Sequence, residues 1–367
     1  MKVLHLTTHL NMGGITVYLL RLVRPLKDLG IEMSVISSGG ELTSTFNKHG
    51  AETYEFPIRT KNELHPKVYA AVPRVARLVR ENKISLIHAH TRITQVLAYW
   101  AGKLAGVPVA TTCHGFYKRR LGRRILPAWG DRAIAISPPV EDSLIDDFKI
   151  NADKIRLIYN AVDVVDLDTA CRNHDPGKAK ESFGFGASDP VIGVVARLVQ
   201  DKGHEFLIHA VPLLLKEFPA LRLLIVGEGK YRSLLEKMAA KAGIGPAVLF
   251  TGNLIDISRP LAAMDVFILP ATWREGFGLS IVEAMACRKP VIATNIWSLN
   301  TLIRNRVNGV MVEPKEVEGL AAAIGELLRD PVLRGKIGTE AQKMVAERFS
   351  IQRMAQEMAE LYREMAL

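Results

Sequence analysis

The stretch that decides the fold runs from residue 270 to residue 286 and reads PATWREGFGLSIVEAMA. It directly follows an apolar run at 266–269, which predicts a buried strand. Leu279, Val282 and Ala286 then recur at helical spacing, so a helix is expected to begin near residues 278–280. A strand, a glycine-containing loop and a helix, in this order, form the repeating unit of a parallel α/β sheet.

The same alternation of short apolar runs and amphipathic segments continues along the whole chain. The first half contains such runs at 3–7, 33–36, 86–88, 107–111, 133–136 and 155–158. The second half contains them at 191–196, 223–226, 248–250, 266–269, 291–293 and 310–312. Runs that are apolar on both faces suit strands covered by helices on both sides. We therefore expect an α/β protein with two Rossmann-like, doubly wound parallel sheets.

The length of 367 residues also suits two domains, and the join is expected within 160–190, where aspartates, glycines and prolines replace hydrophobic periodicity. Two such sheets would leave a cleft between their carboxyl ends, where sheets of this class bind ligands. An amphipathic helix is expected from Ile15 to Leu29, with Pro25 kinking or shortening it. A last helix is expected to start at Ser350 and to need a partner surface.

Two carboxylates within the 270–286 stretch suggest a ligand site. The free N–H groups and the positive dipole end of the expected helix form an anion site that suits a diphosphate. Glu275 precedes this helix and Glu283 lies just over one turn into it. A carboxylate can accept from two neighbouring hydroxyls, as on a ribose or a hexose. Each glutamate alone would be an ordinary surface charge, but together with Gly276 and Gly278 they indicate a nucleotide-sugar site.

A cation pair follows the expected strand at 191–196. Arg197 leaves the carboxyl end of this strand, Lys202 follows in the loop, and Gly203 opens the next helix. Two cations at such a position can neutralise a pyrophosphate that departs with negative charge. A nicotinamide enzyme is disfavoured, because neither the glycines around Gly14 nor those around Gly227 complete the Gly-x-Gly-x-x-Gly fingerprint.

The spacing Glu275, seven residues, Glu283 with an intervening Gly-Phe-Gly resembles the signature of the retaining GT-B glycosyltransferases of family 4, and the resemblance extends over nearly the whole chain. It implies that Glu275 lies by the donor sugar, that Glu283 binds the ribose, and that Arg197 and Lys202 hold the phosphates. Gly14 would face the donor phosphates, and His114 would lie near the 6-hydroxyl of the donor sugar. The resemblance also implies backbone contacts to the donor from Gly276, Phe277, Gly278, Leu279, Ser280, Asn253 and Leu254.

The resemblance further implies that the last helix crosses back to the N-terminal domain. The expected domains are therefore 1–165 with 350–367, which binds the acceptor, and 166–349, which binds the nucleotide-sugar donor. His88 and His90 resemble the His-Ala-His-x-Arg stretch of some cell-envelope glycosyltransferases. They are not expected to form a zinc site, because no third ligand is apparent from the sequence.

The net charge of +10 is concentrated in the first half, where residues 1–160 contain 23 Lys and Arg against 13 Asp and Glu. This imbalance favours an anionic partner such as phospholipid head groups or a phosphorylated glycolipid. We expect the membrane or acceptor contact at the densest basic cluster, Lys118, Arg119, Arg120, Arg123 and Arg124. Nucleic acid is not an expected partner, because no basic motif rich in aromatic residues occurs.

No metal or other cofactor is expected. Asp166-Leu167-Asp168 spells the metal motif of a different glycosyltransferase fold, but it lies in the expected linker with no strand before it. Cys113, Cys171 and Cys287 lack metal-ligand spacing, and all three are expected to be buried thiols in a reducing cytoplasm. The N-terminus is expected to form the first strand and not a signal peptide, and no apolar run is long enough to span a membrane.

We therefore expect a retaining hexosyltransferase that uses a nucleotide sugar, with UDP favoured by the family. Its acceptor would be a saccharide or glycolipid in lipopolysaccharide or cell-envelope biosynthesis. The enzyme would be cytoplasmic, with peripheral attachment to the inner face of the membrane. One alternative is a nucleotide-sugar epimerase of the same fold, which would act without an acceptor. The other is a non-enzymatic scaffold that binds nucleotide sugars at the membrane.

Overall fold

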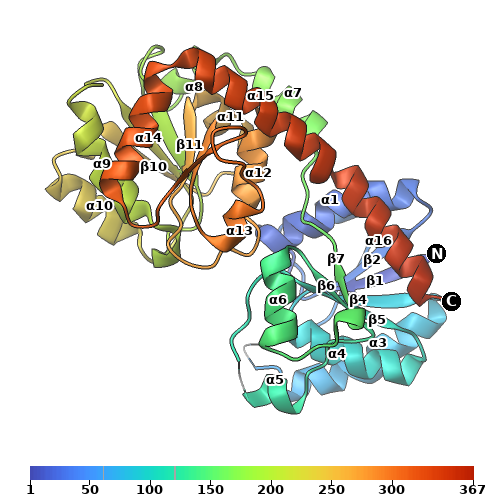
Figure 1. Cartoon of the computed structure of the whole chain (residues 1–367). Coiled ribbons are helices and arrows are strands. Elements are labelled where there is room, and N and C mark those ends of the chain that lie inside the picture. Colours follow the sequence, from blue (N-terminus) through green and yellow to red (C-terminus); the bar gives the residue numbers. More distant parts are fainter. Residues whose placement is uncertain (61, 120) are drawn as a thin grey trace. The chain divides into compact units, whose positions relative to one another are not determined.

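The computed structural model describes residues 1–60, 62–119 and 121–367. The described chain forms two compact units (Figure 1), of which unit 1 comprises Met1–Asn160 and Ile351–Leu367 and unit 2 comprises Ala161–Ser350. Each unit contains one parallel sheet with helices packed against it. The expectation of two Rossmann-like domains is therefore confirmed.

The sheet of unit 1 has the strand order β3-β2-β1-β4-β5-β6-β7. Its strands are β1 (Lys2–Leu6), β2 (Glu32–Ser37), β3 (Glu52–Glu55), β4 (Leu86–Ala89), β5 (Val109–Cys113), β6 (Arg132–Ala135) and β7 (Ile155–Leu157). Its helices are α1 (Gly14–Asp28), α2 (Thr43–His49), α3 (Pro66–Glu81), α4 (Arg92–Ala105), α5 (Leu121–Ile125), α6 (Pro138–Asp146) and α16 (Ile351–Met365). The strand order reverses between β1 and β4, and ligands bind at such a switch point in open α/β sheets.

The sheet of unit 2 has the strand order β10-β9-β8-β11-β12-β13. Its strands are β8 (Val191–Val195), β9 (Arg222–Val226), β10 (Val248–Gly252), β11 (Val266–Leu269), β12 (Val291–Thr294) and β13 (Val310–Val312). Its helices are α7 (Val164–Arg172), α8 (Pro176–Glu181), α9 (His204–Leu215), α10 (Arg232–Lys241), α11 (Ser258–Ala263), α12 (Leu279–Ala286), α13 (Trp297–Asn300), α14 (Val317–Arg329) and α15 (Pro331–Arg348). Here the switch point lies between β8 and β11.

Each apolar run identified in the sequence forms a strand, with ends that shift by one or two residues. The sequence reasoning missed β3, because this edge strand reads Glu-Thr-Tyr-Glu and has no apolar alternation. Helix α1 continues past Pro25 to Asp28, so of the two expected effects, a kink or a shorter helix, the proline does not produce the shorter helix. Leu22 and Leu26, which flank Pro25, are fully buried, and this packing offsets the backbone hydrogen bond that proline cannot donate.

The expected linker at 160–190 is wrong as a description of local structure. Helices α7 and α8 occupy it, capped by the side chains of Asp163 and Asp175, which accept from the backbone N–H groups of Asp166 and Lys178. Their contacts with α11 and α12 assign them to unit 2. The residues that looked like a linker are thus helix caps and turn residues at the start of the second unit.

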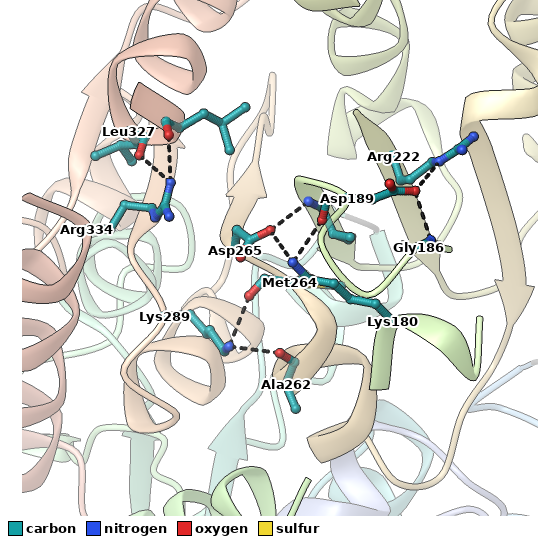
Figure 2. A network of polar contacts seen from close by, with 12 residues as sticks. Lys180, Gly186, Asp189, Arg222, Ala262, Met264, Asp265, Lys289, Leu327 and Arg334 are labelled. Carbon is teal, nitrogen blue, oxygen red and sulfur yellow. Dashed lines mark hydrogen bonds and ion pairs between the residues drawn. The ribbon is translucent and has the colours of Figure 1, made fainter. Parts of the chain in front are cut away.

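A polar network secures the amino ends of the strands in unit 2 (Figure 2). The ammonium of Lys180 lies 2.9 Å from Oδ2 of Asp265 and donates to the carbonyl of Asp189. Asp265 Oδ2 also accepts from the backbone N–H of Val191, the first residue of β8. The Lys289 ammonium donates to two carbonyls, those of Ala262 and Met264, and burial lowers its pKa to about 8. Because this network occupies the amino ends, the carboxyl ends are the edge that remains for ligands.

The structure corrects the expectation for the cysteines in one respect. Cys171 in α7 and Cys287 at the end of α12 form a disulfide across 116 positions of sequence, whereas Cys113 is a buried thiol as expected. The pair was not recognisable from the sequence, because its spacing matches no framework and its members meet only when α7 packs on α12. Among the described helices, none is long and apolar enough to cross a membrane.

Candidate functional site

The loops after β8 and β11 meet at the switch point of unit 2. These two strands are parallel neighbours, and the loops that leave their carboxyl ends contain residues 196–203 and 270–278. The backbone N–H of Thr272 donates to the carbonyl of Asp201 at 3.0 Å, which joins the two loops. The structure therefore brings together the two motifs that the sequence analysis treated separately.

Lys202 and Glu275 form an ion pair at this junction, because the ammonium of Lys202 donates to Oε2 of Glu275. Both side chains are 17% exposed, so the pair is largely shielded from solvent but still reachable. Such shielding strengthens the electrostatic interactions of both groups with any charged ligand. Because the two side chains are in contact, the Lys202 ammonium and the Glu275 carboxylate can bind neighbouring groups of one ligand.

Gly203 makes this close approach of the two loops possible. Its φ of +67° lies in the left-handed region, and an added Cβ would come within 1.9 Å of the carbonyl oxygen of Pro270. Only glycine can adopt this φ and also leave room for the carbonyl of Pro270. Gly203 therefore lets the two loops touch directly beside Lys202. Gly203 also precedes α9 directly, as expected.

Helix α12 begins at Leu279, as predicted, and Gly278 precedes it in a left-handed conformation with a φ of +87°. No acidic side chain lies in the first turn of α12, so an anionic ligand would meet no like charge from it. Phe277 is buried and packs edge-on against Phe349 with ring centroids 5.3 Å apart. Gly276, Leu279 and Ser280 are half-buried, while Glu283 is only 8% exposed in spite of its charge.

The remaining predicted donor residues of unit 2 lie at the same edge of its sheet. Arg197 is exposed directly after Ala196 at the end of β8, and Asn253 and Leu254 follow β10. Sequence reasoning missed His204, which is buried beside Lys202 at the start of α9. Neither ring nitrogen of His204 has a hydrogen-bond partner within the described residues, and burial lowers its pKa to about 4. A buried polar group of this kind calls for a ligand or a water molecule.

In unit 1, a cavity of about 670 Å³ lies at the carboxyl ends of β1 and β4, the switch point of that sheet. Thr8, His9, Arg59, Thr60, Glu63, Thr91, Arg92 and Ile93 line it. The sequence analysis missed this set, although the His-Ala-His-x-Arg stretch ends on Arg92. Gly14 opens α1, which follows β1, and an added Cβ there would meet open space. The cavity has the size and polar lining of a small-ligand site.

His114 directly follows β5 and is half-buried. Its Nε2 lies 3.1 Å from Nδ1 of His90, and Tyr18 of α1 packs edge-on against its ring. Burial lowers the pKa of His114 to about 3, so its imidazole is neutral near pH 7. Because Nε2 faces His90, Nδ1 is the nitrogen of His114 that remains for a ligand, and the tautomer decides whether it donates or accepts.

The expectation that His88 and His90 lack a third partner is wrong. His5 of β1 pairs in register with His88 of β4, and the ligand nitrogens of His5, His88 and His90 lie within 4.8 Å of one another. All three rings are buried. The sequence could not reveal this group, because the register of β1 and β4 alone brings residues 5 and 88 together.

The expected basic cluster is only partly a surface feature. Arg123 is buried, with its guanidinium over the rings of Tyr117, Trp129 and Phe148, so it is not available to a membrane. The planar, weakly hydrated guanidinium stacks on aromatic faces, which explains this burial. Arg119 pairs with Asp147, and Lys118 and Arg124 are exposed. Arg120 lies outside the described residues.

Asp168 of the Asp-Leu-Asp sequence is buried in α7, and not in a linker as expected. Its carboxylate pairs with Arg172 at 2.7 Å and with Arg288 at 3.4 Å. The two arginines balance the negative charge of the Asp168 carboxylate, so no bound cation is needed to do so. The motif is thus part of the packing of α7, although it spells a metal site in another fold.

Two families of known sequences match the chain in adjacent ranges. Glycosyltransferase Family 4 matches residues 12–166, and Glycosyl transferases group 1 matches residues 177–344. An uncharacterized glycosyltransferase of Methanocaldococcus jannaschii is 26% identical over 370 residues, which cover 96% of this chain and 94% of the relative.

Solved structures resemble the fold over its full length. A glycosyltransferase from Rickettsia africae is 26% identical with a TM-score of 0.88, and the match covers 99% of this chain and 98% of that one. Anabaena HepE in complex with UDP-glucose is 25% identical with a TM-score of 0.85, and the match covers 99% of both chains. These similarities include both units and therefore both switch points.

Proposed function

Because this chain belongs to the family 4 glycosyltransferases with two Rossmann-like units, we propose that it transfers a hexose-type sugar from a nucleoside diphosphate sugar to a saccharide or glycolipid acceptor. We further propose UDP as the nucleotide, retention of configuration, and a role in cell-envelope or lipopolysaccharide synthesis. The observation that carries this proposal is the shielded Lys202–Glu275 pair at the β8–β11 switch point, next to the start of α12. The complex of HepE with UDP-glucose supports a uridine donor.

On the donor side, the diphosphate would lie at the amino end of α12 and near the cations of Arg197 and Lys202. The N–H groups of Leu279 and Ser280 begin that helix, where anions are favoured. Glu283, one turn further on, would accept from the ribose hydroxyls, and Glu275 from the donor sugar. When a diphosphate binds, Lys202 would be shared between Glu275 and the phosphate, so the ion pair holds the lysine in place beforehand.

Retention would follow from attack on the face of the sugar from which the diphosphate leaves. The bond between the anomeric carbon and the diphosphate oxygen breaks, the acceptor oxygen bonds to the same carbon, and the leaving diphosphate takes the acceptor proton. Lys202, Arg197 and α12 would stabilise the negative charge that develops on the diphosphate. Most of the rate enhancement would come from positioning and from this charge stabilisation.

The acceptor is proposed to bind in the 670 Å³ cavity of unit 1. The hydroxyl of Thr8 suits the hydroxyls of a saccharide, whereas those of Thr60 and Thr91 also hydrogen-bond to Asn62 and Thr94 of the protein. Arg92 is committed to the protein, since it donates to the carbonyls of Pro127 and Leu126 and pairs with Glu63 at 3.4 Å. The exposed Arg59 is the cation at the rim that could hold a phosphate of the acceptor.

Calorimetric titration of UDP, GDP and ADP into wild type and Glu283→Ala, with and without EDTA, tests the donor site. We expect metal-independent binding of UDP that weakens about ten- to hundredfold in the variant, the cost of losing hydrogen bonds to a charged group. Glu236→Ala, on α10, serves as a matched control with unchanged affinity. Failure of all three nucleotides to bind would remove the donor site and favour the scaffold alternative. Turnover of the donor to an epimer without any acceptor would favour the epimerase.

For the membrane contact, a second face of unit 1 is better suited than the 118–124 cluster. Tyr69 of α3 and Trp100 and Leu104 of α4 are exposed around a hollow of about 570 Å³, with the Lys103 ammonium 4.4 Å from the ring of Tyr99. Residues 66–105 contain seven Lys and Arg against one Glu, so this segment carries +6. Aromatic side chains beside lysines and arginines are typical of contact with anionic lipid head groups.

Sedimentation with vesicles tests this face. We expect wild type to bind vesicles that contain phosphatidylserine, to bind phosphatidylcholine vesicles at least about tenfold more weakly, and to lose binding in high salt. Trp100→Ala with Lys103→Ala should abolish the lipid-dependent part. Trp297→Ala alters a tryptophan of unit 2 that is more exposed than Trp100, and it should leave vesicle binding unchanged. Equal binding of phosphatidylserine vesicles by the Trp100 and Lys103 double variant and by Trp297→Ala would refute this contact.

A further inference from the structure

A buried chain of hydrogen bonds connects the C-terminal helix to His114. Oη of Tyr362 on α16 lies 2.6 Å from Nδ1 of His88 and 3.5 Å from Nε2 of His5. His5 Nδ1 lies 3.0 Å from His90 Nε2, and His90 Nδ1 lies 3.1 Å from His114 Nε2. At the other end, His88 Nε2 lies 2.7 Å from Oγ1 of Thr112. The order of the chain is Thr112, His88, Tyr362, His5, His90 and His114.

The fold of unit 1 accounts for this alignment. His5 and His88 are register partners on neighbouring strands, and His90 lies two residues beyond His88 on the same face. Thr112 and His114 have the same spacing at the end of β5, which neighbours β4. Helix α16 packs against α1 (Figure 1) and places Tyr362, which is fully buried, over the two histidines. The final helix of the chain thus contributes the central link.

The imidazoles face one another in a way that fits direct hydrogen bonds better than a shared metal. The ring centroids of His5 and His90 are 5.2 Å apart and their planes differ by 11°. This separation is close to the largest that a nitrogen–nitrogen distance of 3.0 Å permits, so the two nitrogens lie nearly on the line between the rings. A zinc ion at about 2.0–2.1 Å from each nitrogen would need both lone pairs to converge on a point off that line.

Each imidazole of the chain is neutral near pH 7. Burial lowers the pKa of His5 to about 3, and it lowers the pKa values of His88 and His90 well below the usual range, with further lowering from the neighbouring histidines. A neutral imidazole has one N–H donor and one acceptor nitrogen. The links His5–His90 and His90–His114 then each have one donor only if both point the same way along the chain. The Tyr362 hydroxyl has a single O–H to donate, so it continues this direction when it accepts from one of His88 and His5 and donates to the other. The direction of these hydrogen bonds sets the tautomer of His114.

We propose that His90, His5 and Tyr362 are positioning residues that hold His114 in a single tautomer, with Nε2 turned inward and Nδ1 presented to the donor sugar. Nδ1 of His114 has no hydrogen-bond partner in the described part of the chain, whereas its Nε2 faces His90. A chain that runs from Thr112 toward His114 makes Nδ1 a donor, and the opposite direction makes it an acceptor. This inference rests on the proposed function only for the sugar contact, because the tautomer is a property of the protein alone.

Nitrogen-15 NMR of histidine-labelled full-length protein tests the proposal without substrate. In wild type we expect the His114 nitrogens to report one neutral tautomer. Tyr362→Phe removes the central hydroxyl, so His114 should become a mixture of both tautomers. Tyr99→Phe alters a tyrosine of α4 that is no member of the chain and should leave the His114 signals unchanged. An unchanged single tautomer in a folded Tyr362→Phe protein overturns the proposal, as does stoichiometric zinc uptake by wild type that is lost in His5→Asn.

Turnover provides the second readout. We expect Tyr362→Phe and His90→Leu to lower kcat about tenfold, the value of one hydrogen bond, while the KM for the donor changes less than about twofold. His90→Asn retains an amide near the Nδ1 position and should restore most of the activity lost in His90→Leu. If both His90 variants are equally impaired, position 90 has only a packing role and the proposal fails. A wild type that transfers no sugar would instead refute the proposed function and leave the tautomer result standing.

Discussion

Lys202 and Glu275 neutralise one another, so removal of either side chain leaves the other charge without its partner in a largely shielded position. The pair is also the meeting point of two motifs that lie 73 residues apart in sequence. Its position at the switch point is what distinguishes it from the exposed pairs of this protein, such as Arg77 with Glu81.

Replacement of Lys202 or Glu275 by alanine should lower the turnover of sugar transfer by about two to four orders of magnitude, which is the scale of losing a preorganised charge-stabilising group. Release of nucleoside diphosphate in the presence of acceptor measures this. The exposed Lys241→Ala in α10 is the matched control and should retain wild-type turnover.

The double variant adds a test of common action. If Lys202 and Glu275 both stabilise the departure of the same diphosphate, their effects are not independent. The fold-loss of turnover in the double variant should then be smaller than the product of the fold-losses in the two single variants. Near-wild-type turnover in either single variant would remove that residue from the donor site.

At the level of elements, the position of the loop between β8 and α9 depends on the left-handed backbone conformation of Gly203 as much as on the side chains of the loop. Gly203 brings the 196–203 loop against the carbonyl of Pro270, and the Thr272–Asp201 hydrogen bond continues this contact. The start of α12 similarly depends on Gly278, where an added Cβ would lie 2.8 Å from the side chain of Leu299. The glycines of both motifs therefore position the ion pair and the anion-binding end of α12.

Gly203→Ala should lower the free energy of unfolding by at least about 3 kcal/mol, because left-handed strain adds to the clash with Pro270. Turnover should fall at least tenfold, since the clash displaces Lys202 from Glu275. Gly184→Ala separates the two effects, because Gly184 has a φ of +77° but open space around its Cβ position. Gly184→Ala should lower the free energy of unfolding by about 1 kcal/mol and leave turnover unchanged. Urea denaturation and the transfer assay measure both variants, and equal costs at the two sites would contradict this account.

For the whole molecule, the buried histidines make stability depend on pH. The folded-state pKa of His5 and that of His114 are lowered to about 3, and those of His88 and His90 are well below 6.5, mainly because burial disfavours the charged ring. In the unfolded chain these groups titrate near 6.5. Between the two values the unfolded state binds more protons, so the free energy of unfolding falls as the pH falls.

The expected slope is about 1.4 kcal/mol per pH unit for each histidine, or roughly 5 kcal/mol per pH unit for these four, beginning below pH 6.5. His204, whose pKa burial lowers to about 4, adds one more such contribution. Above that pH these groups contribute no slope. Urea denaturation at pH 7.5, 6.0 and 5.0 measures it. His88→Gln should reduce the slope by about 1.4 kcal/mol per pH unit, the contribution of one proton. His49→Gln, at an exposed position of α2, should leave the slope unchanged. Equal slopes in both variants would show that the buried histidines do not govern acid stability.

The sequence by itself determined the fold class, the positions of the apolar strands and the start of α12, because hydrophobic periodicity and glycine position are local properties of the chain. It also singled out Lys202, Glu275 and Glu283 as candidate site residues, because they lie in the loops and the helix that follow recognisable strands, and their roles stay predictions. Only the tertiary structure decided the partners of these residues. The polar edge strand β3, the burial of Arg123 under three aromatic rings and the Cys171–Cys287 disulfide have no local signature. The Tyr362–His5 contact spans 357 positions, and it exists only because strand register and helix packing bring those residues to one place.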